Sequence, residues 1–116
     1  MFVPMTLKPS EIAEIQKRYY YLTNYESDDP GAPIDPPTYV DSNGDSLLHI
    51  ASAAGDLRTV ELLINAGVHI DLLGDMDNTA LHYAKRKGHE EVARFLIDHG
   101  ASSIVENRFG KLPGDQ

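Results

Sequence analysis

The sequence predicts an all-α fold built as a stack of helix-turn-helix units, and two observations support this prediction. The first is that the chain repeats itself at an offset of 33 residues. The positions that agree in both copies are Leu48-His49 and Leu81-His82, Ala51 and Ala84, Gly55 and Gly88, Leu63-Ile64 and Leu96-Ile97, and Gly67 and Gly100. The second is that turn-forming glycines divide each copy into two short helical segments at matching places. Self-similarity at such a period is typical of stacked repeat proteins.

A helix is predicted near the N-terminus, from about Glu11 to about Tyr25. Ser10 follows Pro9 and is a residue type that favours the start of a helix. Apolar side chains then recur at spacings of three, four and three residues, which places them on one helical face. They are Ile12, Ile15, Tyr19 and Leu22. We expect this helix to cap the first repeat, because two stacked units leave an apolar side uncovered.

The segment of residues 27–37 connects this helix to the repeats. It contains four prolines, one glycine and three aspartates, a composition that cannot continue a helix. It is therefore either an ordered loop or a linker. Together with the helix it makes a first region, residues 1–40, ahead of the repeats.

The first repeat is predicted to span residues 41–73. It opens with the turn-forming residues 41–46, and Ser46 can cap a short helix that runs through Ala54. Gly55-Asp56 interrupts this helix, and a second helix is expected from Leu57 to Asn65. Gly67 is placed to end that helix in a left-handed conformation.

The second repeat, residues 74–106, follows the same plan. Thr79 caps a helix from Ala80 to Lys87, and Gly88 interrupts it. A second helix is expected from Glu90 to His99, and Gly100 ends it. A partial third unit, residues 107–116, has the opening turn but no helices after it.

These motifs resemble the ankyrin repeat family, whose unit opens with Asp-x-x-Gly-x-Thr-Pro-Leu-His-x-Ala and closes with Leu-Leu-x-x-Gly-Ala. The first unit supplies Asp41, Gly44, Ser46, Leu48, His49, Ala51, Gly55, Leu62, Leu63 and Gly67. The second supplies Thr79, Leu81, His82, Ala84, Gly88, His89, Val92, Leu96, Gly100 and Ala101. The resemblance covers about residues 41–113. It departs at Leu47 and Ala80, where the family usually has proline, and at Asp77, which replaces a turn glycine.

The resemblance implies a protein-binding function, in which the turn tips and the exposed positions of each unit's first helix contact the partner. Carried over by position, the partner-binding residues would be Asn43, Asp45, Asp75, Met76, Asn78, Arg86, Lys87, Arg108 and Phe109. We expect these side chains to be free of structural roles, because tips differ between the units where scaffold positions agree. Met76 and Phe109 are the expected apolar anchors, since apolar side chains at tips bury nothing within their own unit.

An enzyme is not expected. The sequence has no glycine-rich phosphate loop, no Gly-x-Ser-x-Gly, no His-Glu-x-x-His and no cysteine. His49 and His82 sit at the same repeat position, where the family's histidine ties the turn to the helix, so a structural role is favoured over catalysis. His69 and Asp71 could hold a metal ion only weakly, because no third ligand is apparent. No metal site and no cofactor are expected.

The net charge of −8 favours a positively charged protein partner and disfavours nucleic acid and anionic membranes. No segment has the long apolar run that spans a bilayer, and a cytoplasmic location is expected. Oligomeric state stays open.

Narrower functions also remain open: an immunity or inhibitor protein that neutralises a basic toxin enzyme, or a regulatory subunit of a complex. The tyrosines of the N-terminal helix are either part of a cap or a partner-binding stripe. Of these two interpretations the cap is favoured.

Overall fold

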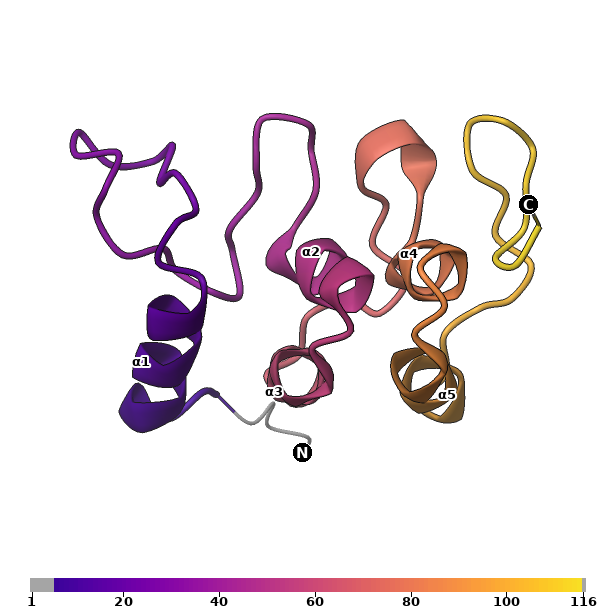
Figure 1. Cartoon of the computed structure of the whole chain (residues 1–116), viewed down its shortest axis with the longest axis horizontal. Helices are drawn as coiled ribbons and strands as arrows, with labels where there is room; N and C mark the ends of the chain where they lie inside the picture. The colour runs from indigo at the N-terminus through magenta and orange to yellow at the C-terminus, as the bar shows by residue number, and fades with distance from the viewer. Residues whose placement is uncertain (1–5, 116) are drawn as a thin grey trace.

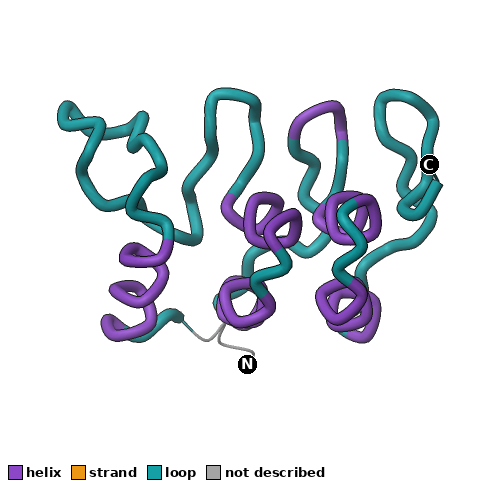
Figure 2. Tube along the Cα trace, in the orientation of Figure 1, coloured by secondary structure: helices purple, strands orange, loops and turns teal. Residues whose placement is uncertain are grey.

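The computed structural model describes residues 6–115, and these residues form helices joined by loops (Figures 1 and 2). The elements are α1 Pro9–Arg18, α2 Leu47–Ala54, α3 Leu57–Asn65, the short 3-10 helix η1 Asp75–Asp77, α4 Ala80–Arg86 and α5 Glu90–Asp98. The pairs α2/α3 and α4/α5 pack side by side, α2 against α4 and α3 against α5. The expected all-α stack of helix-turn-helix units is confirmed.

The loops that begin the successive units project beyond the helices on one side of the stack (Figure 1). We call them finger 1 (residues 41–45), finger 2 (residues 74–78) and finger 3 (residues 107–111). The same backbone hydrogen bond closes each finger at an offset of 33 residues. It joins Asp41 N to Asp45 O (2.8 Å), Gly74 N to Asn78 O (2.8 Å) and Asn107 N to Lys111 O (2.9 Å). The partial third unit therefore builds a complete finger although it has no helix pair.

The helix bounds within the repeats follow the predicted turn chemistry closely. Helices α2 and α3 have the expected bounds, and α4 and α5 each end one residue earlier than expected. Ser46 and Thr79 stand at the two N-caps, and Asp56 caps α3 by accepting a hydrogen bond from Thr59 N. Gly67 and Gly100 have φ of 93° and 96°, the left-handed conformation expected after α3 and α5.

One core runs through the stack and includes leucines from all four repeat helices. Leu48, Leu63, Leu81 and Leu96 are each at most 1% exposed. They belong to a single cluster of buried residues that also contains Ile15 and Tyr19 from the N-terminal region. Neither helix pair could bury these side chains alone, so the stacking itself creates the core.

The N-terminal helix is shorter than the sequence suggested. Helix α1 starts at Pro9 with Lys8 as N-cap, because proline is well suited to the first helical position. It ends at Arg18 and not near Tyr25, since the backbone of Tyr19 has already left helical geometry. The Tyr19 hydroxyl donates to Asp56 (2.7 Å), and this distant contact fixes where the chain leaves the helix. Tyr21 and Tyr25 lie beyond the end of α1 and therefore share no helical face.

Helix α1 caps the stack, as expected, and it is held to α3 by a group of polar contacts that we call the Asp56 clasp. Arg18 pairs with one oxygen of Asp56 (2.6 Å), while the hydroxyls of Tyr19 and Thr59 donate to the other (2.7 and 2.6 Å). A second ion pair joins Glu14 of α1 to Arg58 of α3 (3.1 Å).

The proline-rich connector is an ordered loop. The backbone N–H of Asn24 donates to the carbonyl of Pro30 (2.9 Å), and its side-chain amide donates to the carbonyl of Pro33 (2.9 Å). Gln16 of α1 donates to the carbonyl of Ile34, whose side chain is buried. These contacts settle the choice between loop and linker, because a flexible linker would not be fixed from both sides.

The Asp56 clasp predicts a stability that depends on pH. Burial alone would raise the pKa of Asp56, but hydrogen bonds from Thr59, Tyr19 and Arg18 outweigh it and lower the pKa below its usual value. A carboxyl with a lowered folded-state pKa stabilises the fold above its unfolded pKa of about 3.9, and this contribution disappears as the pH falls further. Asp56→Asn should thus lower the free energy of unfolding by about 1 kcal/mol at pH 7.

Urea denaturation at pH 7 and at pH 3 would measure this effect. The difference between wild type and Asp56→Asn should shrink at pH 3. Asp28→Asn, a change of the same charge on an exposed loop residue, should have little effect at either pH. A difference between Asp56→Asn and wild type that is equally large at both pH values would contradict the role assigned to the charged carboxylate.

Candidate protein-binding surface

The expected partner-binding residues lie on the fingers and on α4, but their exposure differs. Met76 and Phe109 are 40% and 67% exposed. The exposed polar members are Asn43, Arg86, Lys87 and Arg108, while Asp45 and Asp75 are half-buried. Asn78 is buried. Most of these residues therefore lie on one side of the molecule, but Asn78 is not at the surface.

The tips of fingers 2 and 3 are joined. The backbone N–H of Arg108 donates to the carbonyl of Met76 (2.9 Å), and the Arg108 guanidinium lies 3.7 Å from the Met76 sulfur. Met76 and Phe109 therefore sit on two neighbouring tips that are fixed to each other. This arrangement gives an exposed apolar patch, which we call the tip patch (Met76 and Phe109).

The backbone at the tip of finger 2 is strained. Met76 and Asp77 have φ of 55° and 60°, which lie in the left-handed region. The residues equivalent to Asp77 in fingers 1 and 3 are Gly44 and Gly110, which enter this region without steric cost. A non-glycine residue there costs about 1–2 kcal/mol. The strained tip persists because the contacts on either side hold it.

The expectation that Asn78 is available to a partner is wrong. Its side-chain amide donates to the carbonyl of Asp75 (3.0 Å). Its carbonyl oxygen accepts hydrogen bonds from the side chains of Asn107 (2.9 Å) and Arg86 (3.2 Å). Asn78 therefore links finger 2 to finger 3, and its buried amide is used by the fold.

Asp45 also has a structural role that the sequence interpretation missed. Its carboxylate accepts hydrogen bonds from the backbone N–H of Asp75 (2.8 Å) and from the Tyr83 hydroxyl (2.9 and 3.0 Å). Burial, with the hydrogen bond to Asp45, raises the pKa of Tyr83. Gly74 makes the contact feasible, because any side chain there would overlap the Asp45 carboxylate. Asp45 and Asn78 occupy the same repeat position. The polar residue found there in both units was the feature of the sequence that could have predicted this structural role.

Arg86 is exposed but not free of contacts. Besides its hydrogen bond to Asn78, its guanidinium lies 5.6 Å from the centre of the Tyr83 ring. Arg86 thus connects α4 to the base of finger 2. It presents positive charge at the surface, although part of its hydrogen-bonding capacity is already in use.

The two repeat histidines are structural, as expected. The Nδ1 atom of His49 accepts a hydrogen bond from the backbone N–H of Ser46 (3.1 Å). Its proton is therefore on Nε2, which donates to the carbonyl of Leu72 (2.8 Å). His82 repeats this arrangement with Thr79 N (3.0 Å) and Lys111 O (2.9 Å). Burial lowers the pKa of His49, which favours the neutral ring that this network requires.

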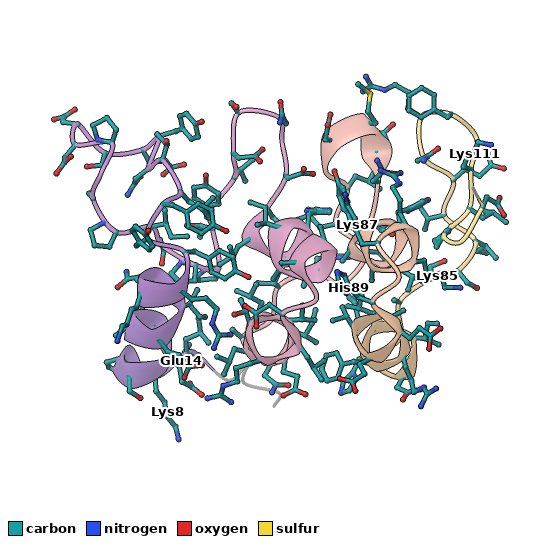
Figure 3. All side chains as sticks on the ribbon, viewed as in Figure 1. Lys8, Glu14, Lys85, Lys87, His89 and Lys111 are labelled. Atoms are coloured by element: carbon teal, nitrogen blue, oxygen red, sulfur yellow. The ribbon has the colours of Figure 1, made fainter. Side chains whose placement is uncertain are left out.

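Charge is distributed unevenly along the stack. Fingers 1 and 2 carry four acidic residues and no basic residue. Positive charge collects around α4 and finger 3, where Figure 3 shows Lys85, Lys87 and Lys111. A ligand lying across all three fingers would therefore meet negative charge at one end and positive charge at the other.

A hollow lies away from the fingers, on the outer face of α4 and α5. It has a volume of about 580 Å³, and Ala84, Gly88, Ala93 and Ile97 contribute to its lining. In the first unit the equivalent face is covered by the second, and a side chain at Gly55 would collide with His89. The hollow is thus the stacking face of the last helix pair.

Within residues 6–115 there is no group of three or more His, Asp or Glu side chains placed to share a metal ion. His69 Nδ1 accepts from the backbone N–H of Asp71 (3.0 Å), and Asp71 accepts from Ser102 N (2.9 Å). These two side chains thus stabilise a turn. In the described part of the chain, no helix is both long and apolar enough to cross a membrane.

A family model described as ankyrin repeats, in three copies, matches residues 20–107. The chain belongs to the ankyrin repeat family. Ankyrin repeats are protein–protein interaction modules, and the fold is generally a non-catalytic scaffold. The repeated histidines, the fingers and the stacked helix pairs described above are therefore the ankyrin architecture in this chain.

Several curated ankyrin repeat proteins are similar to this chain over its repeat region. Human protein phosphatase 1 regulatory subunit 27 is 37% identical over 73 residues, which cover 63% of this chain and 47% of that protein. The probable 26S proteasome regulatory subunit p28 of Saccharomyces cerevisiae is 35% identical over 77 residues, covering 65% and 34%. A Caenorhabditis elegans transient receptor potential cation channel subfamily A member 1 homolog is 34% identical, covering 66% and 6%. The chain spans less than half the length of each of these relatives.

Proposed function

We propose that this chain binds a protein partner through its fingers and the exposed end of α4, with the tip patch at the centre of the contact. The tip patch is the observation that carries this assignment. Met76 and Phe109 are exposed apolar side chains on tips fixed to each other by Arg108. Apolar side chains held in place at a surface are the typical anchors of protein interfaces.

The charge distribution indicates which charges the partner's facing surface would carry. Acidic fingers 1 and 2 favour a partner whose facing surface is basic, while Arg86, Lys87 and Arg108 favour acidic groups at the other end. Such a pattern fixes the orientation of the partner along the stack. Asp75 contributes to the acidic end, whereas the Asp45 carboxylate is already bound to Asp75 N and Tyr83.

Site-specific photo-crosslinking in the source cells would test this surface directly. A photoreactive amino acid replaces Phe109 in one variant and Asn43 in a second. Ile104, which is 79% exposed but lies outside the fingers, carries it in a control variant. We expect one shared protein band from positions 109 and 43 and none from position 104. Crosslinking from position 104 alone would place the interface elsewhere.

Once the partner is identified, truncating the tip patch should weaken binding without unfolding the protein. Phe109→Ala and Met76→Ala should each cost about 1 kcal/mol or more of binding free energy, because each removes exposed apolar area from the centre of the contact. Isothermal titration calorimetry measures the affinity, and thermal melting checks the fold. Wild-type affinity in both variants, with Tyr21→Ala weakened instead, would move the interface to the N-terminal region.

A regulatory or inhibitory role is the more specific version of this function. Two of the relatives are named as regulatory subunits, of protein phosphatase 1 and of the 26S proteasome. The net charge of −8 would also suit an inhibitor or immunity protein that neutralises a basic enzyme. Adding this chain to the purified partner and measuring the partner's activity separates these roles from simple scaffolding.

We place the protein in the cytoplasm and assign it no enzymatic activity. The two repeat histidines offer no support for catalysis, because His49 and His82 are buried and both ring nitrogens of each are hydrogen-bonded to the fold. A general base needs a nitrogen that a substrate can reach.

A further inference from the structure

A small cavity lies in the N-terminal loop, outside the fingers. Its volume is about 140 Å³, roughly that of four or five water molecules at about 30 Å³ each. It is formed within the segment of residues 24–40, which connects α1 to finger 1. The hydrogen bonds from Asn24 to the carbonyls of Pro30 and Pro33 close this loop on itself. The cavity is therefore part of an ordered segment.

The residues that line the cavity include two tyrosines, Tyr25 and Tyr39, and two acidic residues, Glu26 and Asp35. Tyr39 is only 8% exposed, whereas Tyr25 is 56% exposed, so one of the two tyrosines is buried and the other lies at the surface. The Thr38 hydroxyl donates to one oxygen of Asp35 (2.6 Å), which fixes the orientation of this carboxylate.

The segment that forms the cavity is acidic. Residues 24–45 contain six Asp and Glu residues and no Lys, Arg or His. Among the described residues, neither Glu26 nor Asp35 takes part in a salt bridge. Burial raises the pKa of Tyr39, and the nearby charge of Asp41 acts in the same direction. The field at the cavity therefore favours a cation and repels an anion.

We propose that this cavity is a binding site for one cationic side chain, that of an arginine or lysine on a protein partner. Tyrosine faces attract cations, and carboxylates pair with them. The volume suits the charged end of a single side chain. This contact would be separate from the tip patch. A partner that uses both would need a basic segment that extends beyond finger 1 to the loop of residues 24–40.

Binding can be measured on the intact protein with small probes. The probe is N-acetyl-arginine methylamide, and the matched control is N-acetyl-citrulline methylamide, which has nearly the same shape without the charge. In two-dimensional NMR titrations of the isotope-labelled protein, we expect the arginine probe to shift amide signals of residues 24–40 in a saturable way. Nα-acetyl-lysine methylamide, whose side-chain ammonium group is free, should shift the same signals. The citrulline probe should shift them much less.

Variants of the residues that line the cavity test whether the probe binds there. Glu26→Gln and Tyr25→Leu should each weaken the arginine probe by about threefold, the effect of losing one charge pair or one exposed cation–π contact. Asp28→Asn removes the same charge from the same loop but from a residue outside the lining, and it should bind the probe like wild type. Phe109→Ala should also leave this titration unchanged, so the result does not depend on the tip patch.

Three results would overturn the assignment. Equal binding of the arginine and citrulline probes would show that charge is not recognised. Equal weakening by Asp28→Asn and Glu26→Gln would show a diffuse attraction without a site. Shifts confined to residues 41–45 and 74–78 would place cation binding on fingers 1 and 2 instead.

Discussion

Replacing Leu81 with alanine should lower the free energy of unfolding by about 2–5 kcal/mol, the usual cost of truncating a buried leucine. Leu81 is 1% exposed and lies on α4, which packs against both α2 and α5. The truncated side chain would leave a cavity in the core that is shared by both repeats. Because a domain of this size is stabilised by about 5–15 kcal/mol, much of the total would be lost.

Urea denaturation followed by circular dichroism measures this loss. Ile104→Ala is the matched control, since Ile104 is 79% exposed and its truncation should change stability by less than about 0.5 kcal/mol. A loss below half a kilocalorie for Leu81→Ala would mean that this side chain does not reach the shared core, and the stacking would be wrong.

Removing residues 1–37 should abolish the folded monomer. This segment contributes Ile15, Tyr19 and Ile34 to the core, and each is at most 3% exposed. It also supplies Arg18 and Tyr19 to the Asp56 clasp. Without it, the apolar side of the first repeat faces water, and two repeats are fewer than the roughly three normally needed for stability. We expect aggregation or unfolding.

Light scattering after size-exclusion chromatography and thermal melting would detect this outcome. The double variant Tyr20→Ala, Tyr21→Ala provides the control, because these side chains are 80% and 62% exposed and should add little to the core. A shortened protein that stays monomeric with an unchanged Tm would show that α1 is dispensable. Its exposed tyrosines would then be better candidates for an interface.

The repeats were predictable to within one residue because their signals are local. Each cap, break and end is set by side chains within a few positions, and the 33-residue offset supplied most of these signals twice. The end of α1 was not predictable in the same way. It depends on the contact of Tyr19 with Asp56, 37 residues away, and no periodicity in the sequence encodes that contact.

The binding surface was predictable only in part, for the same reason. Exposure of Met76 and Phe109 followed from their positions at the tips. The roles of Asp45 and Asn78 did not, because Asp45 binds Tyr83 and Asn78 binds Asn107, each in the next unit and 38 and 29 residues away. The cavity in the N-terminal loop has no repeat counterpart at all, and it exists because Asn24 closes the loop around Pro30 and Pro33.

The left-handed backbone of Asp77 lowers the stability of the fold but can raise the affinity of the tip for a partner. Glycine at this position, as at Gly44 and Gly110, would relieve strain and also leave the tip freer to move. A mobile tip must lose that freedom when a partner binds, and the lost entropy weakens the complex. Aspartate has fewer backbone conformations available than glycine, and the hydrogen bond from Arg108 N to the Met76 carbonyl holds the tip before any encounter. Engineering this position for heat resistance alone would therefore risk trading affinity for stability.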